Sequence, residues 1–455
     1  MLKARRPLAA FTLLLMLGAC SLVPDYERPD AGVPSAFTGP QAKGASAEIS
    51  AEWWRSFNDE ELQALMNAAL ANNLDIAAAL HRIEQAQGQL RATNASLLPQ
   101  VDASGSASLD KGGARGNGTT KSASGSVSVS YAVDLWGSYR AQSASSEAAL
   151  RASIFDRDAT ALLVQSSVAT TYFNILSLRD RIAIARQSLA AAQETLRLVE
   201  ARYKYGTASA LDLAQQRNTL ATIEAGIPPL ESQLAANEHA LAILLGRAPE
   251  GFGVRTADTS ALILPAIAPG QPSTLLERRP DIRRAEAQLQ AANADIGAAR
   301  AAFFPSLNLS ASKGIDWLAG AGSTSGSSLA ASLLAPIFSG GTLEGNLESA
   351  KARKAELAAS YRKTVLTSFG EVEDALSAAD ANERRQASLA VAASEARKAY
   401  DLAQASYKAG ATDFLSVLDA QRSWLSARDA QAQARLNQFT AAVDLFIALG
   451  GGWKS

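Results

Sequence analysis

The sequence has 455 residues, of which 47% are hydrophobic and only 6% aromatic, with one cysteine and 43 basic against 44 acidic residues. A chain of this length can bury a large core, and its balanced charge gives no footprint for a nucleic-acid partner. A single cysteine excludes an intrachain disulfide and a cysteine-rich metal site. Abundant alanine with few aromatic residues favours long helices that pack through small side chains, so we expect a mainly α-helical protein.

The first twenty residues have the layout of an export signal. Basic residues precede an apolar run over 8–17, and two small residues lead to Cys20. Leu-Gly-Ala-Cys also resembles a bacterial lipobox, in which the cysteine is acylated and becomes the mature N-terminus; ordinary cleavage beside a chance cysteine is the alternative. Ser21 follows where aspartate would favour inner-membrane retention. We therefore predict a signal peptide over 1–19, lipidation of Cys20 and an outer-membrane address.

The segment from Cys20 to about residue 51 contains four prolines, which predicts an extended strap laid along the helices. No stretch beyond the signal has 18 or more consecutive apolar residues, the minimum for a membrane helix. A part of this chain that spans a membrane would therefore consist of β-strands.

An internal repeat with an offset of about 205 residues runs through the chain. Residues 97–99 (Leu-Leu-Pro) recur at 303–305 as Phe-Phe-Pro, and residues 203–206 (Tyr-Lys-Tyr-Gly) recur at 407–410 as Tyr-Lys-Ala-Gly. Two halves that share one plan predict an internal two-fold repeat of the fold.

A Gly/Pro-rich stretch over 246–274 reads as the linker between the halves. The first structural repeat is then 52–245, the second is 275–449, and 450–455 form a short C-terminal tail. Each half is expected to run from a helix through a β-hairpin to a long helical hairpin.

The strands are predicted from alternation of polar and apolar residues. From Val101 to Leu109 the odd positions are apolar or small and the even ones are Asp or Ser, and 126–133 repeat this pattern, which predicts a hairpin over about 100–133. The second half offers a hairpin over about 306–335, with a weaker second strand around 329–333. Four strands are too few to close a membrane barrel and an open edge cannot face lipid, so they predict an oligomer. Ser-rich hairpins of a soluble protein are the alternative.

A helix of unusual length is predicted after each hairpin, the first from about Tyr139 to Tyr203. About 65 residues at 1.5 Å each reach roughly 100 Å. Seven-residue spacing of apolar side chains indicates a coiled-coil surface along it. The positions at this spacing are Val168, Ile175, Ile182, Leu189, Leu196 and Tyr203, and the complementary positions three residues after members of this set are Leu178, Ala185, Ala192 and Val199.

Glycines mark the predicted tips of the two helical hairpins. Gly206 and Gly410 suit the left-handed position that ends a helix. Ser209 can cap the returning helix of the first hairpin, and Thr412 or Asp413 that of the second. The tips are simple turns in one interpretation and shared docking sites for a partner in the other. The candidate docking residues are Tyr203, Lys204, Gly206, Tyr407, Lys408 and Gly410.

Several motifs together resemble the outer-membrane factor family, in its NodT-type lipoprotein branch, over nearly the whole chain. They are Trp53-Trp54, Ala69–Asn73, Leu275–Ile282, Ala294–Arg300 and Phe303–Leu307. The resemblance implies a homotrimer with a twelve-stranded β-barrel in the outer membrane, continued by a periplasmic α-barrel of long helices. It also implies a periplasmic adaptor and an inner-membrane transporter of the resistance-nodulation-division class as partners, with no cofactor.

The resemblance also implies a periplasmic gate. In related channels Leu and Asp side chains near a hairpin tip narrow the duct, and Phe414–Arg422 matches that motif with Leu415, Asp419 and Arg422. The first repeat has Gln215 where the second has Asp419. An ion pair between Asp419 and Arg422, one helical turn apart, is the alternative role for the carboxylate.

The function that follows is the exit channel of a tripartite efflux pump for drugs or other small toxic compounds. Metal-ion efflux and type I protein secretion on the same fold stay open, as does a periplasmic coiled-coil adaptor or scaffold lipoprotein. An enzyme is not expected, because His81 and His239 are isolated and no nucleophile elbow, phosphate loop or metal-ligand cluster is present.

Overall fold

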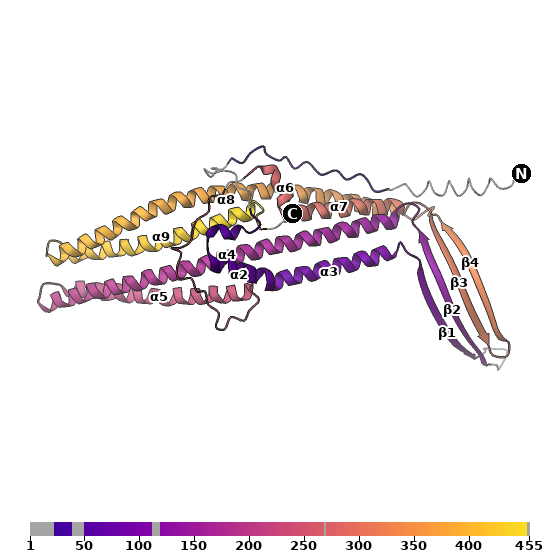
Figure 1. Cartoon of the computed structure of the whole chain (residues 1–455), viewed down its shortest axis with the longest axis horizontal. Coiled ribbons are helices and arrows are strands. Elements are labelled where there is room, and N and C mark those ends of the chain that lie inside the picture. The colour runs from indigo at the N-terminus through magenta and orange to yellow at the C-terminus, as the bar shows by residue number, and fades with distance from the viewer. Residues whose placement is uncertain (1–21, 39–49, 112–118, 268–269, 453–455) are drawn as a thin grey trace. The chain divides into compact units, whose positions relative to one another are not determined.

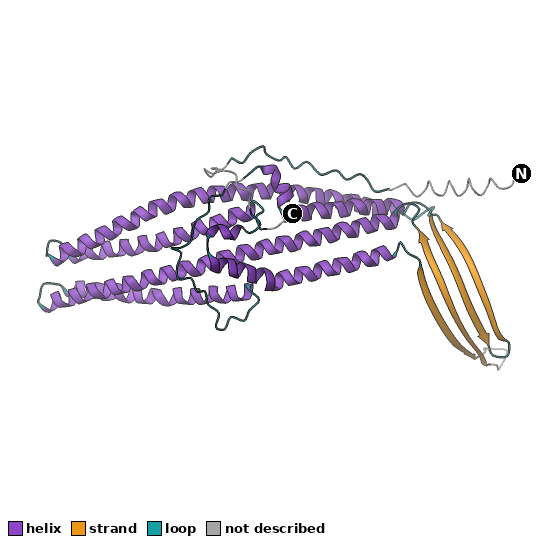
Figure 2. Cartoon of the chain, viewed as in Figure 1, coloured by secondary structure: helices purple, strands orange, loops and turns teal. Residues whose placement is uncertain are grey.

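The computed structural model describes residues 22–38, 50–111, 119–267 and 270–452 (Figure 1). Helices make up most of this part of the chain and the strands form one sheet (Figure 2). The elements follow in chain order as η2 (Trp53–Phe57), α2 (Glu60–Asn72), α3 (Leu74–Ala95), β1 (Gln100–Lys111), β2 (Thr119–Val133), α4 (Ser138–Lys204), α5 (Ala210–Leu244), η3 (Pro272–Thr274), α6 (Leu275–Arg278), α7 (Pro280–Ala301), β3 (Ser306–Leu318), β4 (Gly322–Leu334), α8 (Thr342–Lys408) and α9 (Phe414–Ala448).

The internal repeat is confirmed by matched helix lengths. Helices α3 and α7 have 22 residues each, α4 and α8 have 67 each, and α5 and α9 have 35 each. A helix of 67 residues extends roughly 100 Å. The two halves therefore share one sequence of elements.

The tips of the two helical hairpins end and restart their helices as the sequence indicates. Gly206 and Gly410 have φ of 72° and 75°, the left-handed conformation that favours glycine. Ser209 starts α5 with a capping box completed by Asp212, and Asp413 starts α9 by accepting a hydrogen bond from the backbone N–H three residues on. Each tip is thus a short, well-capped turn.

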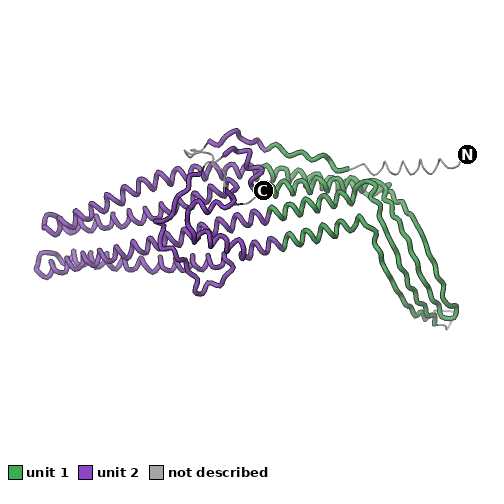
Figure 3. The backbone as a smooth tube through the Cα atoms, viewed as in Figure 1, with its two compact units in different colours: residues 1–30, 81–155, 281–364 green, residues 31–80, 156–280, 365–455 purple. Residues whose placement is uncertain are grey.

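Two compact units divide the chain (Figure 3). The first holds the described parts of 1–30, 81–155 and 281–364, and the second holds those of 31–80, 156–280 and 365–455. The sheet lies in the first unit, whereas both hairpin tips and the linker lie in the second.

In the first unit, the two hairpins merge into one antiparallel sheet of order β1-β2-β3-β4. Pairing of β2 with β3 joins the two halves of the chain, with Val133 opposite Leu307 and Ser122 opposite Leu318. Strand β4 begins at Gly322, well before the predicted 329–333. Its early part is Ser/Gly-rich and has no clear alternation, but the backbone ladder with β3 holds it as a strand.

The register gives the sheet one polar and one apolar face. Hydroxyl groups meet across neighbouring strands on the polar face as Ser104 with Ser126 (2.9 Å), Ser106 with Ser124 (2.8 Å), Ser108 with Ser122 (2.7 Å) and Ser312 with Ser328 (2.8 Å). A row of the other face runs across all four strands through Val101, Val129, Ala311 and Leu329. Lys313 lies in the next row of that face, so the apolar band narrows there.

In the second unit, the coiled-coil seam of α4 follows the predicted heptads only in part. Val168, Ile175 and Ile182 are buried, but Tyr203 is 47% exposed. Beyond Ile182, Ala192 and Val199 are buried at predicted heptad positions, but Ser188 and Thr195 are buried in place of the neighbouring Leu189 and Leu196.

The core of the second unit is an aromatic cluster near its linker. Trp53 stacks on Phe446 with ring centroids 5.3 Å apart, and Phe57 packs against Phe173 at 5.1 Å. The Trp53 indole N–H donates to Gln165 at 3.2 Å, so its one polar atom is satisfied inside the core. The Trp53-Trp54 pair is therefore part of the packed core.

Candidate functional site

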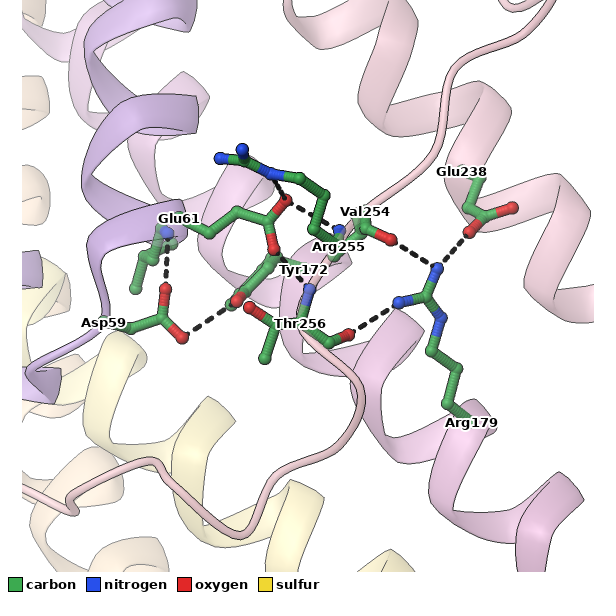
Figure 4. Close-up of polar contacts among 9 residues, drawn as sticks. Asp59, Glu61, Tyr172, Arg179, Glu238, Val254, Arg255 and Thr256 are labelled. Carbon is green, nitrogen blue, oxygen red and sulfur yellow. Dashed lines mark hydrogen bonds and ion pairs between the residues drawn. The ribbon is translucent and has the colours of Figure 1, made fainter.

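The linker is fastened to the second unit by a polar network that sequence reasoning did not find (Figure 4). Glu61 accepts the backbone N–H groups of Arg255 and Thr256, both at 2.7 Å. Arg179 donates to the carbonyl oxygens of Val254 (2.7 Å) and Thr256 (2.6 Å). Burial alone would raise the pKa of Glu61, but the donated backbone hydrogen bonds outweigh it and hold that pKa below its ordinary value.

The outer edges of β1 and β4 have no strand partner within the described chain. On β4 the apolar face is bare, with Leu329 86% and Leu333 67% exposed. Unpaired backbone N–H and C=O groups are costly in lipid, and exposed leucine side chains are costly in water. An edge that carries both therefore suits neither environment. The described sheet therefore leaves two edges open to further strand pairing.

The predicted gate residues share one exposed face of α9. Leu415, Asp419 and Arg422 are spaced i, i+4 and i+7, and all are exposed, Leu415 by 53%. On the opposite face Phe414 and Val417 are buried. Within the described residues no ion pair joins Asp419 to Arg422, so the carboxylate is not neutralised by that arginine. The face is free to meet its counterpart on another copy.

The two hairpin tips, alike in sequence, differ in exposure. Tyr203 and Tyr205 of the first tip are 47% and 80% exposed, whereas Tyr407 of the second is 4% exposed. Arg202 covers the Tyr407 ring at 4.3 Å from its centroid and donates to the Tyr407 carbonyl oxygen at 2.8 Å. Only the first tip presents aromatic surface; Lys204 and Lys408 are exposed on both.

Further contacts join the first hairpin to the second behind the tips. Arg181 forms an ion pair with Asp429 at 2.7 Å, and the hydroxyl groups of Thr195 and Tyr400 lie 3.2 Å apart. Tyr400 stacks on Trp424 at 5.1 Å, and its burial raises the pKa of the phenol. No sequence signal identifies these pairs, because they depend on how the two repeats pack together.

Cys20, the predicted lipidation site, lies outside the described residues. The strap that follows it is fixed on α7 within the first unit. Arg28 pairs with Glu286 at 2.8 Å, and the Pro24 carbonyl oxygen accepts from Asn293 at 2.7 Å. Closer to Cys20, the Leu22 carbonyl oxygen accepts from Arg300 at 3.3 Å.

No group of three or more His, Cys, Asp or Glu residues that suits a metal ion occurs in the described part of the chain. One 18-residue window of α4 reaches a mean hydropathy of 1.2, and 61% of that window is buried against the rest of the protein. Its apolar character is accounted for by helix packing.

Comparison with known proteins gives consistent matches over the whole chain. The family model for the outer membrane efflux protein matches residues 65–247 and 271–451. The pyoverdine export outer membrane protein OpmQ of Pseudomonas aeruginosa is 38% identical over 98% of this chain and 97% of its own. The cation efflux system protein CusC of Escherichia coli is 32% identical over 98% and 99%. The solved structure of the outer-membrane channel OprN has a TM-score of 0.85 at 30% identity, covering 95% of this chain and 100% of that one.

Proposed function

Because this chain belongs to the outer membrane efflux protein family, we propose that it works as a homotrimer that forms the exit duct of a tripartite efflux pump. It is an outer-membrane efflux channel with a β-barrel and an α-barrel, in agreement with its structural neighbours. The observation that carries the trimer is the four-stranded sheet with two free edges, a polar face and an apolar face. Such a sheet is one segment of a barrel.

The number of copies follows from how wide the interior of the barrel must be to conduct solutes. Two copies of a four-stranded sheet would close a barrel of eight strands, whose interior is filled by side chains. Three copies give twelve strands, enough to leave a water-filled duct lined by the serine pairs. In this arrangement β4 of each copy pairs with β1 of the next, and the row through Val129 and Leu329 faces lipid. Native mass spectrometry of the detergent-extracted protein should give the mass of three chains; two chains would contradict the proposal.

The gate is the part of the proposal that rests on Leu415, Asp419 and Arg422. Three-fold symmetry brings three copies of this face together around one axis. Three leucines narrow the duct, and three carboxylates form a ring that binds cations. Neutral solutes pass only when this ring widens. The exposure of this face and the missing Asp419–Arg422 ion pair support this role.

The partners are a periplasmic adaptor and an inner-membrane transporter of the resistance-nodulation-division class. The hairpin tips are the proposed docking sites, and the two tips expose different side chains. Tyr203, Lys204 and the turn at Gly206 offer an aromatic and basic surface, whereas Lys408 and Gly410 offer polar surface above the covered Tyr407. An adaptor that reads both tips therefore meets two distinct surfaces.

Small organic molecules are the proposed cargo. OpmQ, named for pyoverdine export, shares 38% identity with this chain, against 32% for the cation efflux protein CusC. A passive duct lined by serine hydroxyls and carboxylates suits hydrated polar solutes of either kind, and selection lies with the transporter. Acylation of Cys20 is the proposed anchor in the outer membrane, as the lipobox-like sequence before it indicates.

The test is single-channel conductance in a planar bilayer. Replacing both Leu415→Ala and Asp419→Ala should raise conductance several-fold, because the narrowing side chains are removed. The matched control is Leu211→Ala with Gln215→Ala, the same positions of the first repeat, which should leave conductance unchanged. Unchanged conductance in a correctly assembled trimer of the first variant would remove the gate assignment.

A further inference from the structure

A pocket of about 450 Å³ lies in the first unit where the helices meet the sheet. Its lining comes from the ends of the strands, the loops after β2, α7 and β4, and the first turns of α4; most of it is apolar, with Asp134, Ser138 and Gln142 among the polar residues. The residues that define it are Trp136, Tyr139, Ala302, Phe304, Leu334 and Pro336. We call it the junction pocket; its volume is in the range of small-ligand sites.

The walls of the junction pocket are rigid. Trp136 stacks on Phe304 with centroids 4.7 Å apart, and its indole N–H donates to the Pro305 carbonyl oxygen at 2.8 Å. Beside the pocket, Ile337 and Phe338 are 94% and 91% exposed. Aromatic rings with one polar edge next to bare apolar side chains are typical of the membrane–water interface.

The strap runs toward this pocket along one stripe of α7. Asn293 holds Pro24, Gly297 lies under Val23, and Arg300 holds Leu22. Residue numbers fall along the strap as they rise along the helix, so the two run antiparallel. The spacing i, i+4, i+7 defines one helix face.

The end of α7 leads into the junction pocket. Helix α7 ends at Ala301, which lines the pocket together with Ala302 and Phe304 just beyond it. Arg300, which holds Leu22, immediately precedes Ala301 in the pocket lining, and two residues of extended chain span about 7 Å. The mouth of the pocket therefore lies within reach of a chain that continues from Leu22 toward the N-terminus.

Gly297 allows the strap to pack closely against α7. A Cβ placed on Gly297 would collide with the Val23 side chain and lie 2.9 Å from the Val23 Cα. No larger residue fits under the strap without displacing it. The contact fixes the strap at the point from which the N-terminus leaves α7.

We propose that the junction pocket receives an acyl chain of lipidated Cys20. This rests on the proposed acylation of that cysteine and adds a protein site for the lipid, which otherwise lies only in the bilayer. The chain enters between the strap and Phe304, covers the exposed Phe338 side chain, and ties the anchor to the helix–sheet junction. An acyl chain of a free membrane lipid is the other source of the same chemistry.

The experiment uses the full-length protein from cells fed a fatty acid with a photoreactive diazirine. Outer membranes are irradiated, and crosslinked peptides are mapped by mass spectrometry. Crosslinks should concentrate on the peptides holding Trp136 and Phe304. They should fall several-fold in a Cys20→Ser chain exported by an ordinary cleavable signal, which carries no acyl group.

Three outcomes would overturn the proposal, and the same digest distinguishes them. An unacylated N-terminal peptide would show that the proposed lipidation itself fails. Equal crosslinking in the Cys20→Ser chain would assign the pocket to free lipid. An acylated Cys20 peptide with crosslinks elsewhere would refute the pocket alone. In Ala302→Trp, which fills the pocket, crosslinks should leave these peptides, whereas Ala95→Trp, on an exposed helix end, should keep them.

Discussion

Arg202 on the first helical hairpin donates from Nη1 to the Tyr407 carbonyl oxygen on the second, and its guanidinium carbon lies 4.3 Å from the centroid of the Tyr407 ring. The Tyr407 hydroxyl oxygen is buried and has no hydrogen-bond partner among the described residues. Arg202 therefore holds the second tip through both the backbone and the aromatic ring of Tyr407. The second tip, which adjoins the proposed gate face of α9, is thus tied to the first hairpin.

Arg202→Met should loosen the second tip and raise the open probability of the channel. The change keeps the length of the side chain but removes a charged hydrogen bond and a cation–π contact, together roughly 2 kcal/mol. Single-channel recording measures the effect. Arg217→Met is the matched control, because it removes an exposed ion pair with Glu200 that stays within the first hairpin. Equal open probability in the two variants would contradict a latch at Tyr407.

Gly297→Ala should release the strap from α7. The added methyl group overlaps Val23, and such overpacking costs about 1 to 3 kcal/mol. Cleavage after Glu27 by a glutamate-specific protease should become faster, and the melting temperature should fall. Gly88→Ala on α3 is the control, since its Cβ would meet nothing within 4 Å and alanine favours a helix by about 1 kcal/mol. A strap that stays equally protected in both variants would refute the close contact.

Glu61→Gln should weaken the linker network and make the melting temperature depend less on pH in the acidic range. The folded-state pKa of Glu61 lies below its ordinary value of 4.5, so its ionised form stabilises the fold above that value. This contribution is lost as pH falls through the lowered pKa. Melting temperatures between about pH 5 and about pH 3 should fall more steeply in the wild type than in the variant. A Glu356→Gln change on the surface of α8 serves as the control, and parallel curves for all three proteins would contradict the assignment.

Local patterns predicted much of this fold. Alternation over Val101–Leu109 placed β1, and the Tyr-Lys-x-Gly pairs placed both tips, because turn glycines and two-residue periodicity are properties of short segments. The start of β4 was missed, since its Ser/Gly residues become a strand only by pairing with β3. The burial of Ser188 and Thr195, in place of Leu189 and Leu196, was missed for a similar reason: burial there depends on the facing helix.

The candidate site was predicted less completely. Leu415 and Asp419 were found by their motif, and their shared exposed face agrees with a gate. The burial of Tyr407 was not foreseen, because Arg202 reaches it from the other repeat, about 205 residues away in the chain. Nor was the junction pocket foreseen, since Trp136 and Phe304 belong to different halves.

Drug susceptibility of a strain without its other outer-membrane efflux channels tests the central claim most directly. The strain is deleted for this gene and complemented with the wild-type or the Cys20→Ser chain, then challenged with unrelated dyes, detergents, antibiotics and metal salts. Deletion should sensitise the cells to several unrelated organic compounds, and the wild-type chain should restore resistance. Sensitisation to copper or silver salts alone would redirect the cargo to metal ions. Unchanged susceptibility to every compound, with the protein present in the outer membrane, would contradict a role as the exit duct of an efflux pump.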